Sequence, residues 1–273
     1  MVKTMPTSAC NRGLLLAVVS FCLVFFFGSP ALAGKIDDLI KQLKSDDFRV
    51  RTQAALALGA SRDKAAVPPL CGALSDSNNT VKMAAAAGLG KLGFDGGKPC
   101  LREARGKEKD ATVISAFDKA IEKIILGGDP PPPGPNAKYY LAIQVTNKTK
   151  RGSLEIEGVV RKAMQAKCLA SSACAVAPRA ETAAQGKEVV KAKKLTGYLL
   201  IASVEPFNYS GGNLAVQLKV TMWTYPDKAL KAEFGPKLKQ EGTPSEDKAS
   251  EDVLMGMAAE TAVESFLKVA ASL

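Results

Sequence analysis

One stretch near the amino terminus recurs at a nearly fixed interval and limits what the chain can fold into. It reads DDFRVRTQAALALG at Asp46–Gly59 and DSNNTVKMAAAAGLG at Asp76–Gly90, and a more divergent copy, KDATVISAFDKAI, begins at Lys109. The valines at equivalent places, Val50, Val81 and Val113, are 31 and then 32 residues apart. A repeat of this length is typical of stacked helical pairs, each too small to bury its apolar face alone. We therefore expect an α-solenoid of about three pairs.

Helical periodicity is visible within each unit. Ile36, Leu39, Ile40 and Leu43 have the spacing of one buried helix face, and Leu70 and Leu74 repeat it in the next unit. In the second helix of the first unit, the side chains expected to face inward are Val50, Ala54, Ala57 and Leu58. Ser45-Asp46-Asp47 supplies capping side chains before this helix, and Gly59 is expected to end it.

The repeated stretch resembles the short bacterial form of the HEAT repeat family. The pattern D-x-x-V-R-x-x-A-A-x-A-L-G is present as Asp47, Val50, Arg51, Ala54, Ala55, Ala57, Leu58 and Gly59. The second copy has Lys82 in place of the Arg and an inserted Gly88, and the third lacks the alanine pair and the Arg. The resemblance covers residues 36–126 and implies a solenoid with a concave recognition surface. It implies no chemistry.

The first 33 residues have the composition of a secretory signal peptide. Lys3 and Arg12 precede the apolar run GLLLAVVSFCLVFFFG at Gly13–Gly28, which is followed by Ser29-Pro30 and Ala31-Leu32-Ala33. We expect cleavage after Ala33, because small residues precede it in the A-x-A arrangement. The alternative is a short uncleaved membrane anchor. Cys22 lies in the middle of the apolar run after Phe21, so a lipoprotein site is rejected.

Composition excludes several classes of enzyme. The chain has no His, which removes Ser-His-Asp and Cys-His catalysis, imidazole bases and His-ligated zinc. Its formal net charge is +10, but Lys and Arg are spread along the chain. We interpret the charge mainly as a contribution to solubility, with weak contact to an anionic surface left open.

A proline-rich stretch separates two compositions. Residues 127–136 contain Gly127-Gly128-Asp129 and the run PPPPGP, which favours a semi-rigid polyproline II spacer between domains at 34–126 and 137–273. A docking ligand is the alternative role for this stretch. Beyond it we expect strands at 139–146, 173–177, 198–204, 214–223 and 230–234, with a hairpin connection at Asn208–Asn213. The strand at 198–204 is expected to be central and buried on both faces.

A helix is expected after Ser153, which can cap it, and further helices are expected at 181–194 and after the capping box Thr243-Pro244-Ser245-Glu246. The order β-α-β-α-β-β-β-α predicts a two-layer α+β domain with helices over a mixed sheet. The chain as a whole is thus an α+β multidomain protein with an amino-terminal α-solenoid. In outline the second domain resembles the amino-terminal domain of the Tol-system propeller protein and the α+β domain of the curli-secretion lipoprotein. That comparison rests on topology and not on a motif.

Four Cys remain after the expected cleavage, an even number that favours disulfides in an exported chain. Cys71 and Cys100 hold similar places in adjacent units, so stacking brings them close. Cys168 and Cys174 flank the turn between a helix and a strand. The alternative for each pair is buried thiols. Without His a catalytic thiol is not expected, and the spacing is neither a redox nor a zinc motif.

Other candidates have a structural interpretation beside a functional one. The carboxylate pairs Asp37-Asp38, Asp46-Asp47 and Glu251-Asp252 suggest metal or acid–base chemistry, but each is placed near a helix start, where it offsets the helix dipole. Lys191, Lys193 and Lys194 form either an anion contact or a solvated helix end. Tyr209, Trp223 and Tyr225 form either an aromatic contact patch or packing at a sheet edge.

These patterns predict a non-catalytic exported protein of the cell envelope, periplasmic or secreted. It is expected to act as an adaptor or scaffold that binds a protein partner through its repeats. The alternative is a binding module for an anionic envelope polymer or membrane surface. A hydrolase without His is a third class with little support. No cofactor, metal site or nucleic-acid partner is expected, nor stable membrane insertion after cleavage.

Overall fold

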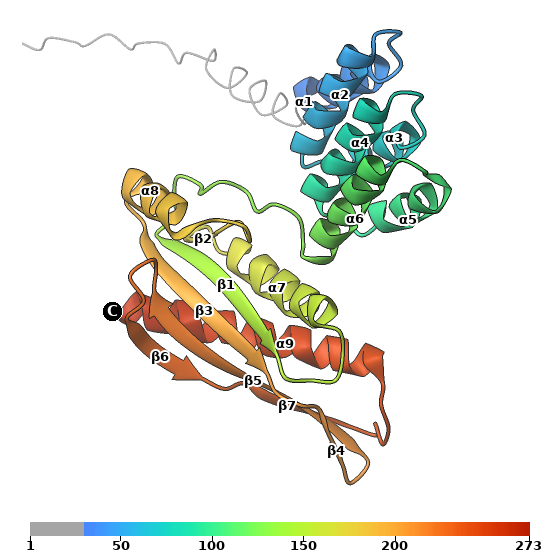
Figure 1. Cartoon of the computed structure of the whole chain (residues 1–273). Helices are drawn as coiled ribbons and strands as arrows, with labels where there is room; N and C mark the ends of the chain where they lie inside the picture. The colour runs from blue at the N-terminus through green and yellow to red at the C-terminus, as the bar shows by residue number, and fades with distance from the viewer. Residues whose placement is uncertain (1–29) are drawn as a thin grey trace, which may run out of the picture.

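The computed structural model describes residues 30–273, with side chains from residue 35 onward. The predicted signal peptide lies largely outside the described residues. The described chain has an amino-terminal group of helices and a carboxy-terminal sheet with three helices (Figure 1). The amino-terminal helices are α1 (Pro30–Gln42), α2 (Phe48–Ala60), α3 (Val67–Ala73), α4 (Asn79–Leu92), α5 (Gly97–Lys107) and α6 (Ala111–Ile125), with a short 3-10 turn at Lys64–Ala66.

Each second helix of a unit begins at a capping side chain. The side-chain oxygen of Asp47 accepts from the backbone N–H of Arg49 at 2.8 Å, and Asn78 does the same for Thr80 at 2.9 Å. Asp110, in the third unit, caps α6 through two N–H groups. The capping expected from Asp47 is therefore confirmed, and it recurs at the repeat interval.

Helices α2, α4 and α6 stack side by side because small residues line their contacts. A Cβ built on Gly59 would lie 2.3 Å from the Cα of Gly88, and one built on Gly90 would lie 3.1 Å from the Cα of Ala120. The backbones thus approach more closely than larger side chains allow. Around these contacts lies one apolar core, formed by Ile36, Ala55, Leu58, Ala66, Val67, Leu70, Leu74, Ala84, Ala85, Ala86, Leu89, Leu101, Val113, Phe117, Ala120 and Ile124.

The prediction for Val50 is wrong. Val81 and Val113 are fully buried, whereas Val50 is 37% exposed and Ala57 is half-buried. Val81 lies on the side of α4 that packs on α2. No helix among the described residues covers the equivalent side of α2, so Val50 is exposed. The buried side of α2 carries Ala54, Ala55, Leu58 and Gly59.

The carboxy-terminal part is a curled mixed sheet. Its strands are β1 (Tyr139–Asn147), β2 (Cys174–Val176), β3 (Thr196–Val204), β4 (Asn208–Ser210), β5 (Asn213–Thr224), β6 (Leu230–Phe234) and β7 (Lys237–Glu241). β1 pairs in parallel with β2 and β3, and β3 pairs antiparallel with β5. β4 and β7 pair with the first half of the long strand β5, and β6 pairs with its second half.

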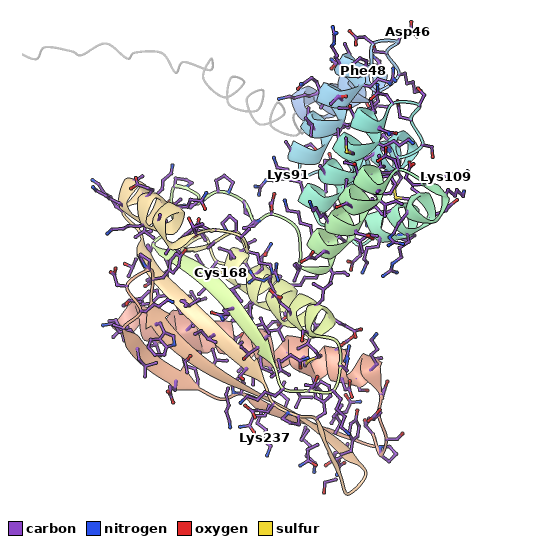
Figure 2. All side chains as sticks on the ribbon, viewed as in Figure 1. Asp46, Phe48, Lys91, Lys109, Cys168 and Lys237 are labelled. Atoms are coloured by element: carbon purple, nitrogen blue, oxygen red, sulfur yellow. A yellow bond between two sulfur atoms is a disulfide. The ribbon has the colours of Figure 1, made fainter. Side chains whose placement is uncertain are left out.

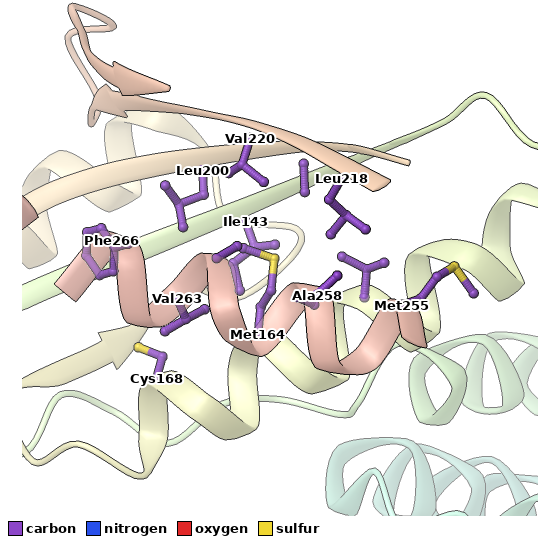
Figure 3. Close-up of a cluster of buried hydrophobic side chains, with 14 of the residues drawn as sticks. Ile143, Met164, Cys168, Leu200, Leu218, Val220, Met255, Ala258, Val263 and Phe266 are labelled. Atoms are coloured by element: carbon purple, nitrogen blue, oxygen red, sulfur yellow. The ribbon is translucent and has the colours of Figure 1, made fainter. Parts of the chain in front are cut away.

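Helices α7 (Ser153–Leu169) and α9 (Lys248–Ser272) cover one face of the sheet, and α8 (Ala183–Lys193) lies at one end. Figure 3 shows Met255, Val263 and Phe266 spaced along α9, with Leu200 and Val220 of the strands across from the helix. These five side chains are all buried, together with Met164 of α7. This core confirms the predicted α+β class with helices over a mixed sheet.

Several details of the sheet differ from expectation. β3 is central, but Leu199 and Ile201 are only half-buried, because α8 covers only part of the second face. The sequence did not predict β4 and β7 as strands. The sequence predicts Asn208–Asn213 as the connection between the strands at 198–204 and 214–223. It contains β4 and the Gly211-Gly212 turn, whose two φ angles are positive and which joins β4 to β5 in a tight hairpin.

The predicted capping box at Thr243 is also wrong. α9 begins at Lys248, and its cap is Asp247, which accepts from Ala249 N–H at 3.1 Å. Thr243 is buried at the end of β7, where its hydroxyl accepts from Gln240. A capping box does form at Thr182 and Gln185, before α8. The expected cap at Ser153 is wrong too, because Gly152 holds the cap position of α7 and Ser153 is its first helical residue.

The two parts of the chain are in direct contact rather than only joined by a spacer. A Cβ built on Gly158 of α7 would lie 2.6 Å from the carbonyl oxygen of Ile125, at the end of α6. Lys162 of α7 pairs with Asp95 at 2.6 Å. The proline stretch begins against the repeats, where Pro130 is buried and its carbonyl accepts from Arg62. The domain boundaries at 126 and 137 stay predictions.

Candidate protein-interaction site

The stacked second helices present an exposed surface whose residues recur with the repeat. We call it the repeat face, and it comprises three rows of exposed residues on α2, α4 and α6: Arg49, Thr80 and Thr112; Leu56, Ala87 and Lys119; Ala60, Lys91 and Lys123. Members of each row are 31 and then 32 residues apart. Residues seven and four apart lie on one side of a helix, so the rows form one continuous surface.

The repeat face changes character along the array. On α2 it carries Leu56, which is 43% exposed, and Phe48, 38% exposed, lies next to it. On α4 and α6 it carries Lys91, Lys119 and Lys123. Figure 2 shows Phe48 on α2 and Lys91 on α4. The α2 end thus has exposed apolar side chains beside Arg49, which lies over the Phe48 ring, and the α6 end is basic. This surface is suited to a partner that is acidic and has an apolar part facing α2.

Two ion pairs, one repeat apart, hold successive units in register. Arg51 of α2 donates two hydrogen bonds to Asp76, with Nε–Oδ2 and Nη2–Oδ1 distances of 2.7 and 2.9 Å. Lys82, at the equivalent place in α4, donates to Glu108 at 2.7 Å. The third equivalent position is Ile114, which has no charge. The pairs therefore couple the first unit to the second and the second to the third.

The environment of these carboxylates lowers their pKa values. The hydrogen bond from Arg51 lowers the pKa of Asp76, and that effect exceeds the opposing effect of burial. The hydrogen bond from Lys82, followed by those from the backbone of Asp110 and Lys109, lowers the pKa of Glu108 to about 2. Both groups are thus charged at neutral pH.

Both predicted disulfides are present in the structure. Cys71 of α3 bonds to Cys100 of α5 with a Cα–Cα distance of 5.7 Å, and Cys168 of α7 bonds to Cys174 of β2 with a Cα–Cα distance of 5.4 Å. Both separations are in the usual range for disulfides. The first joins adjacent units, and the second joins a helix to the sheet it covers. Disulfides are compatible with an extracytoplasmic location.

The predicted aromatic residues do not form one patch. Tyr209 lies on β4 beside the start of β5, whereas Trp223 and Tyr225 lie at the far end of β5. The hydroxyl of Tyr209 donates to Glu251 at 2.7 Å, and that of Tyr225 donates to Glu181 at 3.0 Å. The three aromatics therefore serve separate contacts.

The carboxylate pairs also differ in role. Asp47 caps α2, as expected, but Asp37-Asp38 lie within α1, which begins at Pro30. Glu251 is buried and pairs with Arg151 at 2.9 Å, and Asp252 lies 2.7 Å from the same guanidinium. The sequence missed this network, because Arg151 precedes Glu251 by 100 residues and no local pattern links them. Lys191, Lys193 and Lys194 are exposed at the end of α8.

Among residues 35–273, no group of three His, Cys, Asp or Glu side chains is placed to hold a metal ion. Within the described part of the chain, no helix is long and apolar enough to cross a membrane.

Comparison with known proteins finds a matching family for the amino-terminal repeats but not for the carboxy-terminal sheet. The solved structures that match include a PelC dodecamer from Paraburkholderia phytofirmans, with 14% identity, a TM-score of 0.29, and coverage of 48% of this chain and 92% of that one. Hypothetical protein CT253 from Chlamydia trachomatis matches with 11% identity and a TM-score of 0.34, covering 48% of this chain and 96% of that one. Lipoprotein GNA1162 from Neisseria meningitidis has 14% identity and a TM-score of 0.28, covering 48% and 99% respectively.

Scores of this size establish no shared fold. The resemblance of the second domain to the Tol-system protein stays an expectation, since none of these three is described as a Tol-system protein. No curated protein matches the chain. Residues 36–122 match the family profile described as HEAT repeats. The match supports a HEAT-repeat segment at residues 36–122, and HEAT repeats suggest a protein-interaction scaffold.

Proposed function

We propose that this protein is an exported, non-catalytic adaptor of the cell envelope that binds a protein partner on its repeat face. The observation that carries the proposal is the set of nine exposed positions in register on α2, α4 and α6. Stacked repeats use such extended surfaces for recognition. The two disulfides and the apolar run at Gly13–Gly28 support export to a compartment outside the cytoplasm.

The apolar end of the repeat face is the part expected to contribute most binding energy. Leu56 is exposed, so its replacement by Asp should leave the helix folded while removing an apolar contact. A buried apolar anchor at an interface contributes about 2 kcal/mol or more, equivalent to about thirtyfold in affinity. Lys119→Glu tests the basic end in the same way.

The test is quantitative affinity capture of the exported protein from its native envelope after mild cross-linking. Glu103→Lys is the control, because Glu103 is exposed on α5 in the other helical layer. One discrete protein should be captured by the native chain and the control, and lost with Leu56→Asp. Capture that is insensitive to Leu56→Asp but disappears with salt would contradict the adaptor, and would favour binding of an anionic polymer.

A further inference from the structure

A second recognition feature lies in the carboxy-terminal domain, where one edge of β1 is left open. β2 pairs with β1 only from Tyr139 to Leu141, and the N–H of Ala177 then closes the ladder on the carbonyl of Leu141 at 2.9 Å. Backbone groups of alternate residues point to the same edge of a strand. Those of Ile143 and Val145 therefore face the side on which the described chain provides no further strand.

A buried arginine is placed at this open edge. Arg161 of α7 is 4% exposed, donates through Nη2 to the carbonyl of Ile143, and contacts Glu157 through Nε at 3.3 Å. Among residues 35–273, its third nitrogen, Nη1, has no hydrogen-bond partner. Nη1 is not among the fully buried atoms that lack a partner, so it is open to the cavity, where it can donate to a further acceptor.

The edge and the arginine line one cavity of about 460 Å³. Its walls come from β1 at residues 142–145, from α7, from the loop at Ala177–Glu181, and from Tyr225 and Lys228 beyond β5. This volume is in the range of ligand-binding clefts in proteins.

Charge in the cavity favours an anion. Arg161, Arg179 and Lys228 line it, with the carboxylates Glu157 and Glu181. Glu157 already accepts two hydrogen bonds from Arg179, at 2.8 and 3.0 Å. Burial would raise the pKa of Glu157, but the hydrogen bonds and charges of Arg179 and Arg161 outweigh it and lower the pKa.

The carboxylate of Glu181 likewise already has hydrogen-bond partners within the protein. It accepts from the hydroxyl of Tyr140 at 2.6 Å and from that of Tyr225 at 3.0 Å. Burial and the contact with Glu181 raise the pKa of Tyr225 to about 12, so both hydroxyls keep their protons at neutral pH. Both carboxylates thus have partners within the protein. The residues that line the cavity have an excess of one positive charge, and Arg179 also pairs with Glu122, which lies outside the lining.

We propose that this groove binds an extended segment of a protein partner by strand addition to β1, with an Asp or Glu side chain of that segment placed against Arg161 and Arg179. An extended backbone matches the free groups of Val145, and a carboxylate matches the unused guanidinium donor. Arg179 also lies 3.5 Å from Glu122 of α6, so the groove adjoins the repeats. This site is distinct from the repeat face, and the proposal does not depend on binding at the repeat face.

The test uses the mature chain and fluorescent, N-acetylated short peptides in which Thr and Val alternate and one Glu is moved along the sequence. Matched peptides carry Gln in place of Glu, or a central Pro that blocks strand pairing. Fluorescence anisotropy at physiological ionic strength measures binding. We expect the best Glu peptide to bind about tenfold more tightly than its Gln counterpart, and the Pro peptide not to bind.

Two variants and a control locate the site. Arg179→Gln should weaken binding about tenfold, whereas Arg105→Gln should leave it unchanged. The control is matched, because the two arginines are 47% and 48% exposed and each pairs with a carboxylate. Val145→Pro removes the edge N–H and should abolish binding while the melting temperature is retained, since Pro is tolerated at a strand edge. If Val145→Pro unfolds the domain, the comparison of Arg179→Gln with Arg105→Gln tests the proposal by itself.

Three results would overturn the proposal. In the first, no Glu peptide binds more tightly than its Gln counterpart. In the second, Arg105→Gln weakens binding as much as Arg179→Gln. In the third, free acetate binds while the peptides do not, which would indicate an anion pocket without strand addition.

Discussion

Replacing Gly59 by Ala tests the close approach of α2 and α4. The new Cβ would lie 2.3 Å from the Cα of Gly88, and the Gly88 carbonyl carbon and oxygen would both be 3.1 Å away. These neighbours are backbone atoms, so the helices must move apart by about 1 Å, and overpacking of this kind costs about 1–3 kcal/mol. The better helix propensity of Ala returns about 1 kcal/mol. We expect a net loss of up to about 2 kcal/mol of unfolding free energy.

Gly106→Ala is the matched control, because Gly106 is also the second-to-last residue of its helix, α5, and a Cβ there has no neighbour within 4 Å. This change should stabilise the repeats by about 0.5–1 kcal/mol. Urea titrations followed by far-UV circular dichroism measure both variants. Fluorescence of Trp223, the single Trp, reports on the sheet separately. If Gly59→Ala proves as stable as Gly106→Ala, the close packing inferred for α2 and α4 is wrong.

Three further predictions concern the charges, the disulfides and the amino terminus. The pKa of Glu108 is lowered from 4.5 to about 2, so its stabilising effect is complete above pH 4.5 and is lost as the pH falls towards 2. Urea midpoints of the native chain should therefore fall over this window more steeply than those of Glu108→Gln, and parallel curves would contradict the pairing with Lys82. Reduction should destabilise the chain by about 3.6 kcal/mol through the 29-residue Cys71–Cys100 separation and by about 2.2 kcal/mol through the six-residue Cys168–Cys174 separation. Non-reducing peptide mapping checks both bonds, and free alkylation of either pair in the folded protein would show that its bond is absent. Intact-mass analysis of the exported protein should give a chain beginning at Gly34, whereas a chain that retains Met1 would favour a membrane anchor.

Local patterns predicted most of the secondary structure. The repeat interval located α2, α4 and α6, because each unit repeats a capping side chain and an apolar spacing that depend only on nearby residues. The alternation in β5 located a strand with one buried face. Both disulfides followed from the placement of Cys in neighbouring elements.

The failures arose where distant residues decide the outcome. Val50 has the same local pattern as Val81, but no helix of the described part of the chain covers it, so it is exposed. Thr243 has the local pattern of a helix cap, but its hydroxyl accepts a hydrogen bond from Gln240 of β7. The cavity at the edge of β1 was not predicted, because Arg161 reaches Ile143 across 18 residues of chain and no motif marks that contact.

Site-specific photocross-linking tests the central claim most directly. A photoreactive residue is placed at position 87, in the middle of the repeat face on α4, or at position 103 on α5 in the other helical layer. The exported protein is irradiated in its native envelope, and adducts are identified by mass spectrometry. We predict one discrete protein adduct from position 87 that is absent from position 103 and is lost when Leu56→Asp is added. The same adduct from both positions, or no protein adduct from position 87, would contradict an adaptor that binds through its repeat face.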